Sequence, residues 1–120
     1  MQWRAPEEYF DEPVDEKIDI WSLGNNFYSL LTGHYPFYQV TQDTKEIQEK
    51  IKGHETSLID PRFKERSFAE RTLAEIIPMC WEYEPDDRVD IFELLRLLRQ
   101  AVEEDKKLHS DTPQKNDRVD

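Results

Sequence analysis

The fold of this chain is decided by residues 17–32, whose sequence is KIDIWSLGNNFYSLLT. Large apolar side chains recur through this stretch at spacings that place them on nearly every side of a helix. A helix that is apolar all round is normally buried by other elements. Gly33 provides a suitable end for the helix, and Pro36 prevents its continuation. We therefore expect a central helix at 17–32, against which the rest of the chain packs.

Three further helices are predicted from a repeated capping pattern, in which Ser or Asp is followed three positions later by Glu. The side-chain oxygen of the first residue accepts a free backbone N–H, and the Glu favours the positive end of the helix. The capping residues are Asp43, Ser67 and Asp90. The helices that they predict cover about 44–52, 68–80 and 91–105. Pro78 lies late in the second of these helices and should cause a kink or a tightened end.

Composition limits the possible partners and compartments. The chain has 120 residues, enough for one small domain, and a net charge of −11 from 27 acidic and 16 basic residues. This balance repels nucleic acid and anionic membrane surfaces, so neither is expected as a partner. No apolar run approaches the roughly 20 residues that a membrane span needs, and the first residues form no apolar signal segment. The single cysteine excludes an internal disulfide and suits a reducing compartment, so we expect an intracellular, cytoplasmic protein.

The cysteine and the histidines do not suggest a reactive or metal site. Cys80 falls on the apolar side of a predicted helix, where a small buried hydrophobe is the expected role. The three histidines are scattered along the sequence and lack the spacing of metal ligands. The end of the chain, residues 106–120, is polar and contains Pro113, which is typical of disorder. We therefore expect an ordered part at 1–103 and a disordered tail at 104–120.

Three separated motifs occur in one order along the chain. Trp-Arg-Ala-Pro-Glu occupies 3–7, Asp-Ile-Trp-Ser-Leu-Gly occupies 19–24, and Cys-Trp at 80–81 is followed by Pro85 and Arg88. With the helices between them, these motifs resemble the C-terminal lobe of a eukaryotic protein kinase, from the Ala-Pro-Glu motif to the last helix. The resemblance covers about residues 2–101 and looks most like the tyrosine kinase and tyrosine-kinase-like branches. It implies an all-α fold, a partial kinase C-lobe of about four helices plus loops.

The resemblance assigns structural roles to eight residues and a catalytic, cofactor-binding or metal-binding role to none. It implies a buried ion pair between Glu7 and Arg88, because the planar fork of arginine bonds a carboxylate with two parallel contacts. It places Trp21 and Trp81 in the core near the Ala-Pro-Glu segment. The residue matching Asp19 anchors the family's catalytic loop, which would precede this chain, so here the carboxylate is expected to be either stranded without its partner or solvated. The eight structural residues are Ala5, Pro6, Glu7, Asp19, Trp21, Gly24, Trp81 and Arg88.

The residues that would bind ATP or transfer phosphate are missing. Phosphoryl transfer in this family needs a Gly-rich loop, a strand lysine, a catalytic-loop Asp and a metal-binding Asp-Phe-Gly. The chain has only 3 glycines, and neither His-Arg-Asp nor Asp-Phe-Gly occurs in it. We therefore expect no cofactor here, whereas a full-length parent would use ATP and Mg²⁺. A truncated gene product or a shortened chain explains this better than an evolved pseudokinase, which usually keeps the whole fold.

Two adjacent asparagines depart from the family pattern. Asn25 and Asn26 follow Gly24, where the family usually has apolar residues facing the core. A buried amide without a partner costs about 1–3 kcal/mol. Either a polar network includes these side chains, or this side of the helix is open to solvent.

Two functions of different kinds fit the sequence, beside the less specific reading of a generic acidic helical domain. The first is a fragment of a protein kinase, whose full-length parent transfers the γ-phosphate of ATP to protein hydroxyls. The second is a non-catalytic interaction module, derived from a kinase C-lobe, that docks a protein substrate or regulator through the 44–52 helix region. The apolar helix at 17–32 could also cause self-association, because upstream segments that cover it in the family are absent here.

Overall fold

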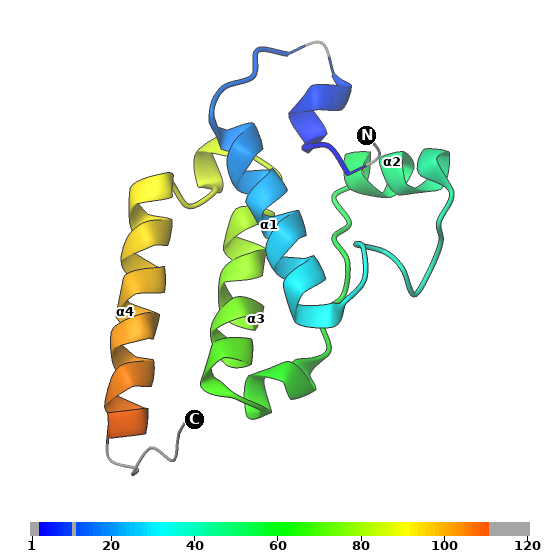
Figure 1. Cartoon of the computed structure of the whole chain (residues 1–120). Coiled ribbons are helices and arrows are strands. Elements are labelled where there is room, and N and C mark those ends of the chain that lie inside the picture. Colours follow the sequence, from blue (N-terminus) through cyan, green and yellow to red (C-terminus); the bar gives the residue numbers. More distant parts are fainter. Residues whose placement is uncertain (1–2, 11, 111–120) are drawn as a thin grey trace, which may run out of the picture.

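A computed structural model describes residues 3–10 and 12–110 as an all-α fold in which these residues form no strand (Figure 1). Four α-helices and three short 3₁₀-helices follow one another along the described chain. The α-helices are α1 (Lys17–Thr32), α2 (Thr44–Lys52), α3 (Phe68–Cys80) and α4 (Ile91–Ser110). The 3₁₀-helices are η1 (Pro6–Tyr9), η2 (Pro61–Glu65) and η3 (Pro85–Asp87).

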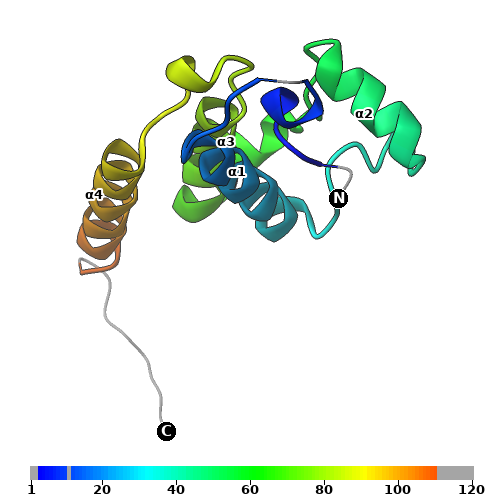
Figure 2. The ribbon, with the colours of Figure 1, turned by 90° about the horizontal axis from the view of Figure 1, so that it is seen from above.

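Helices α1 and α3 pack along each other and form the centre of the molecule. Helix α4 lies on one side of this pair, and α2 lies on the other side with η1 packed against it (Figures 1 and 2). The two ends of the described chain therefore contribute to opposite sides of one central helix pair.

The predicted helix starts are confirmed by their caps. The Asp43 carboxylate accepts hydrogen bonds from the N–H groups of Lys45 and Glu46 at the start of α2. Ser67 forms a reciprocal capping box with Glu70 at the start of α3. The Asp90 Oδ1 accepts the N–H of Glu93 at 2.8 Å. Each cap satisfies a backbone donor that the first helical turn leaves free.

The late proline shortens the last turn of α3 without breaking the helix. The N–H of Trp81 donates to the carbonyl of Pro78 at 3.1 Å, which is the three-residue spacing of a 3₁₀ turn. This is the tightened end that the sequence predicts.

Two predictions about the helices need correction. Helix α4 continues to Ser110, so the predicted helix end near 105 and the disorder predicted from 104 are wrong for 104–110. Ion pairs one helical turn apart, Glu103–Lys106 at 3.6 Å and Glu104–Lys107 at 4.0 Å, favour the extension of this polar helix. The rest of the predicted tail, 111–120, lies outside the described residues.

Helix α1 has the predicted bounds but is not buried on every side. Ile20, Trp21 and Tyr28 are buried, while Leu30 is 74% exposed. The helix ends at Gly33, which has a φ of 76° that glycine adopts without strain.

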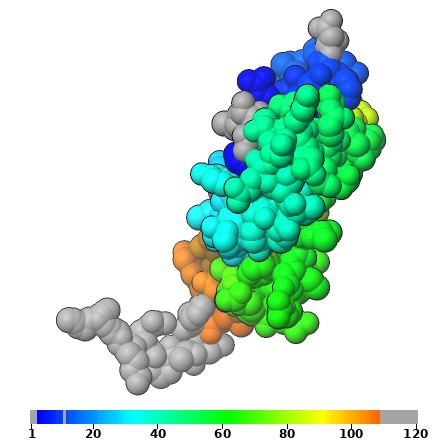
Figure 3. Space-filling view, turned by 90° about the vertical axis from the view of Figure 1, so that its right-hand side faces the viewer, coloured from blue at the N-terminus to red at the C-terminus, as the bar shows by residue number. Residues whose placement is uncertain are grey.

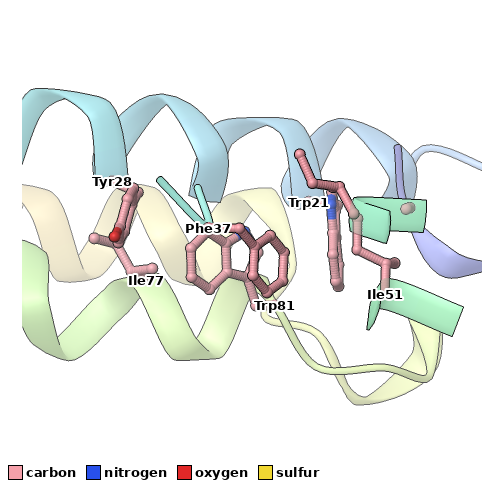
Figure 4. Close-up of a cluster of buried hydrophobic side chains, with 8 residues drawn as sticks. Trp21, Tyr28, Phe37, Ile51, Ile77 and Trp81 are labelled. Atoms are coloured by element: carbon pink, nitrogen blue, oxygen red, sulfur yellow. The ribbon is translucent and has the colours of Figure 1, made fainter. Parts of the chain in front are cut away.

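A cluster of buried side chains joins α2 to the central helix pair (Figure 4). The Trp81 ring centroid lies 6.3 Å from that of Trp21 and 5.4 Å from that of Tyr28. Phe37, from the loop after α1, and Ile51, from α2, complete this side of the core. Aromatic rings at these separations pack favourably beyond the area that they bury.

A buried polar contact holds the loop after α1 in an unusual conformation. Phe37 has a φ of 68°, and its N–H donates to the Ser57 Oγ at 2.8 Å. The Ser57 hydroxyl donates in turn to the Tyr28 hydroxyl at 3.0 Å. The sequence did not indicate this contact, because its three residues come from separate segments.

Candidate functional site

The Ala-Pro-Glu motif forms the start of η1. The Glu8 Oε1 accepts the N–H of Ala5 at 2.9 Å, which caps the start of this short helix. Pro6 occupies the first helical position, where its missing N–H costs nothing. Ala5, Pro6 and Glu7 are buried, so the turn directs the Glu7 carboxylate into the protein.

The Glu7 carboxylate forms a buried ion pair with Arg88, as the resemblance implies. Two N–H···O bonds of 2.7 Å join them in parallel. The side chains are 0% exposed for Arg88 and 3% for Glu7. The pair therefore connects the described N-terminus to the turn before α4, across 81 residues of sequence.

Every N–H of the Arg88 guanidinium has an acceptor. Besides the two bonds to Glu7, it donates to the carbonyl oxygens of Glu82 at 2.7 Å, Tyr83 at 3.0 Å and Lys17 at 3.1 Å. A guanidinium has five N–H groups, so none is left unsatisfied. Its central carbon also lies 5.1 Å from the ring centroid of Trp21. Burial of the charge is thus compensated by hydrogen bonds, an opposite charge and an aromatic face.

Lys17 ties the start of α1 to the same turn. Its ammonium donates to the carbonyl oxygens of Pro85 at 3.2 Å and Arg88 at 2.9 Å. Sequence reasoning missed this residue, because a lysine at the start of an apolar helix gives no sign of partners about 70 positions away.

A second network links the two core tryptophans through an amide. The Asn25 Nδ2 donates to the carbonyl of Trp3 at 2.8 Å, and the Trp81 Nε1 donates to the Asn25 Oδ1 at 3.0 Å. The Trp21 Nε1 also donates to the carbonyl of Trp3, at 3.0 Å. Asn25 is therefore part of a polar network, whereas Asn26 is exposed. The sequence left open a polar network or a side of the helix open to solvent. The first applies to Asn25 and the second to Asn26.

Gly24 belongs to this cluster, but Asp19 does not. Gly24 is buried where α1 approaches the end of α3, and a Cβ atom at this position would lie 2.8 Å from the Cβ of Cys80. The Asp19 carboxylate is exposed, and no hydrogen bond or ion pair joins it to the described residues. Seven of the eight structural residues predicted from the resemblance thus come together, whereas Asp19 lies at an exposed position apart from them.

The cluster contains no group suited to covalent or metal chemistry. Burial raises the pKa of the Cys80 thiol to about 11, which keeps it protonated near neutral pH. Among the described residues, no group of His, Cys, Asp and Glu side chains is arranged to hold a metal ion. None of the helices in the described part of the chain is long and apolar enough to cross a bilayer. The hydrogen bonds of Arg88 hold the Ala-Pro-Glu turn against the start of α1 and the turn before α4.

Comparison with known proteins gives a consistent match. A family model described as "Protein kinase domain" matches residues 1–98. The serine/threonine-protein kinase KIC1 of Saccharomyces cerevisiae is 34% identical over 95 residues, which are 78% of this chain and 8% of that protein. The insulin-like receptor of Caenorhabditis elegans is 31% identical over 99 residues, or 82% of this chain and 5% of the receptor. The serine/threonine-protein kinase STY17 of Arabidopsis thaliana is 27% identical over 112 residues, or 92% of this chain and 18% of that kinase. The chain therefore spans less than a fifth of the length of each of these relatives.

Proposed function

The chain belongs to the protein kinase domain family, and from this premise we propose that it is part of a catalytic domain whose longer form transfers the γ-phosphate of ATP to protein hydroxyls. Its described residues form an all-α partial C-lobe. The Gly-rich loop, His-Arg-Asp and Asp-Phe-Gly of the family do not occur in its sequence. ATP and Mg²⁺ would therefore be bound by other parts of a longer protein, and this chain would not act as a kinase by itself.

The buried Glu7–Arg88 pair is the observation that carries this proposal. A buried ion pair contributes little net stability compared with apolar residues of similar size, so its value lies in fixing geometry. In kinases the activation loop lies between Asp-Phe-Gly and Ala-Pro-Glu. The pair would thus hold the end of that loop against α1 and α3 at a defined position.

The proposal is tested by comparing this chain with a longer product of its gene. Calorimetric titration with ATP and Mg²⁺ should give no binding heat for the 120-residue chain. The in-frame sequence upstream of Met1 should encode His-Arg-Asp and Asp-Phe-Gly, and the longer protein should bind ATP and phosphorylate a protein substrate. Micromolar ATP binding by the short chain, or an upstream sequence without either motif, would contradict the proposal.

A second candidate function is protein docking through the α2 region. The loop before α2 exposes two aromatic side chains, Tyr35 at 66% and Tyr38 at 38%. Exposed Tyr and Trp are enriched at protein interfaces, because they combine apolar area with a polar group. This surface would receive a protein substrate or regulator whether or not phosphate is transferred. A net charge of −11 disfavours nucleic acid as the partner, and the single buried cysteine fits a cytoplasmic location.

A further inference from the structure

An open pocket of about 700 Å³ lies between the end of α1, the loop that follows it and the start of α2. Figure 3 views the side of the molecule on which this loop and α2 lie. The volume falls within the range of roughly 300–1,000 Å³ that ligand pockets occupy. The pocket is separate from the Glu7–Arg88 pair, since neither residue lines it.

The lining of the pocket is rich in rings and lacks formal charges. Trp3 and Tyr35 stack with ring centroids 4.7 Å apart, and His34 and Tyr38 stack at 4.0 Å. Pro36 adds a fifth ring to the lining. Among the residues that the structure describes, no Asp, Glu, Lys or Arg side chain lines the pocket, although these residues make up 36% of the chain. The pocket is therefore suited to an uncharged ligand with apolar surface.

The lining discriminates between the common ways in which proteins bind peptides. A charged peptide would find no side chain of opposite sign among the described lining residues, so the lining itself gives its charge no paired partner. A β-strand needs the free edge of a sheet, and residues 3–10 and 12–110 form no strand. An amphipathic helix usually enters a long aliphatic groove. A polyproline II segment, in contrast, docks into grooves lined by aromatic rings.

Polar groups at the pocket also suit such a segment. A polyproline II helix has no internal hydrogen bonds, so its carbonyl oxygens remain free to accept them. The hydroxyls of Tyr35 and Tyr38 and the amide of Gln42 are hydrogen-bond donors in the lining. The indole N–H of Trp3 donates to the carbonyl of Pro36 at 3.1 Å, and one face of the ring stacks on Tyr35, so both contacts fix the orientation of the ring.

We propose that this pocket binds an uncharged, proline-rich segment of a partner protein in the polyproline II conformation. The proposal rests on the docking role proposed above for the α2 region and names the chemistry of the partner. It is independent of ATP binding and of phosphoryl transfer.

The test measures fluorescence anisotropy of a labelled, end-blocked decaproline titrated with the 120-residue chain. The unlabelled competitors are decaproline itself, a Gly-Ser decapeptide, Pro-Glu and Pro-Lys alternating decapeptides, and an amphipathic helical peptide. Unlabelled decaproline should displace the labelled peptide at the lowest concentration. Tyr35→Ala should weaken binding by about twofold to tenfold, the effect of losing one aromatic contact. Phe92→Ala should leave binding unchanged, because Phe92 is an exposed ring on α4 outside the pocket.

A second measurement keeps the proposal testable if Tyr35→Ala disturbs the fold. In a ¹H–¹⁵N correlation spectrum of the unaltered chain, saturating decaproline should shift the indole signal of Trp3 and leave those of Trp21 and Trp81 in place. The proposal is overturned if decaproline binds no better than the Gly-Ser peptide, or if the Trp3 signal does not move. Tyr35-dependent binding of the charged or helical peptide would overturn the ligand class and leave the docking role standing. If none of the peptides binds, both the ligand class and the docking role fail, whereas the kinase proposal is unaffected.

Discussion

Gly24 lies so close to Trp81 that a Cβ atom at position 24 would come within 2.8 Å of the indole Nε1. The Trp81 ring is held by its hydrogen bond to Asn25 and by packing against Trp21 and Tyr28. It cannot move aside without disturbing these contacts. The glycine therefore sets the distance between α1 and the end of α3.

Gly24→Ala should lower the free energy of unfolding in spite of the better helix propensity of alanine. The propensity gain is roughly 0.5–1 kcal/mol, whereas overpacking a filled core typically costs about 1–3 kcal/mol. Ser22→Ala, at an exposed position of the same helix, is the matched control and should change stability little. Denaturant unfolding of both variants measures the difference. A Gly24→Ala protein as stable as the control would show that the contact can relax.

Arg88→Ala should cost about 3–5 kcal/mol of stability, because it leaves the Glu7 carboxylate buried without a partner. Arg62→Ala is the control, since Arg62 also forms an ion pair, with Asp60, but its side chain is 84% exposed. That variant should be nearly neutral, because exposed pairs are screened by solvent. Equilibrium denaturation gives both values, and equal losses would contradict the role assigned to the buried pair.

A double variant separates the charge from the packing. Glu7→Leu combined with Arg88→Met removes both charges and retains apolar volume. It should be less destabilised than the sum of the two single variants, because neither charge is left alone. Additive losses would indicate that the two side chains do not act as a pair.

The Cys80 thiol should react slowly with a disulfide reagent in the folded protein at pH 8 and rapidly in denaturant. Burial raises its pKa to about 11, compared with about 8.5 for an unfolded cysteine. The raised pKa contributes stability that is present below pH 8.5 and is lost as the pH rises towards 11. Cys80→Ala should remove this part of the pH dependence. Rapid reaction of the folded protein would show that the thiol is accessible.

The chain should self-associate through α1, as its apolar sequence suggests, and Leu30 is the side chain most available for contact. Leu30→Lys should lower the average mass measured by light scattering and reduce binding of a hydrophobic dye. Ser22→Lys, exposed on the same helix, should leave both values unchanged. A monodisperse monomer that binds no dye would contradict this prediction.

Local features of the structure could be predicted from the sequence because they depend on neighbouring residues. The caps at Asp43, Ser67 and Asp90 act within one helical turn, so the starts of three helices were predicted correctly. The end of α4 was not predicted, because its last turns are polar and give no apolar periodicity. The three 3₁₀-helices were also missed, although each begins with a proline, which was a usable signal.

The candidate site was only partly predictable, because its contacts join distant segments. The Glu7–Arg88 pair came from the resemblance, since no spacing rule connects residues 81 positions apart. The contacts of Lys17 with the turn before α4 left no trace in the local sequence. Asn25 was noticed as an unusual amide, but its two partners became known only from the fold.

The long separation between Glu7 and Arg88 also affects how the chain folds as it is made. At about 5–20 residues per second, a ribosome needs roughly 4–16 s to add the 81 residues between them. During this interval the Glu7 carboxylate lacks the Arg88 partner that accompanies its burial in the folded chain. The Ala-Pro-Glu turn therefore remains accessible to chaperones and proteases until late in synthesis.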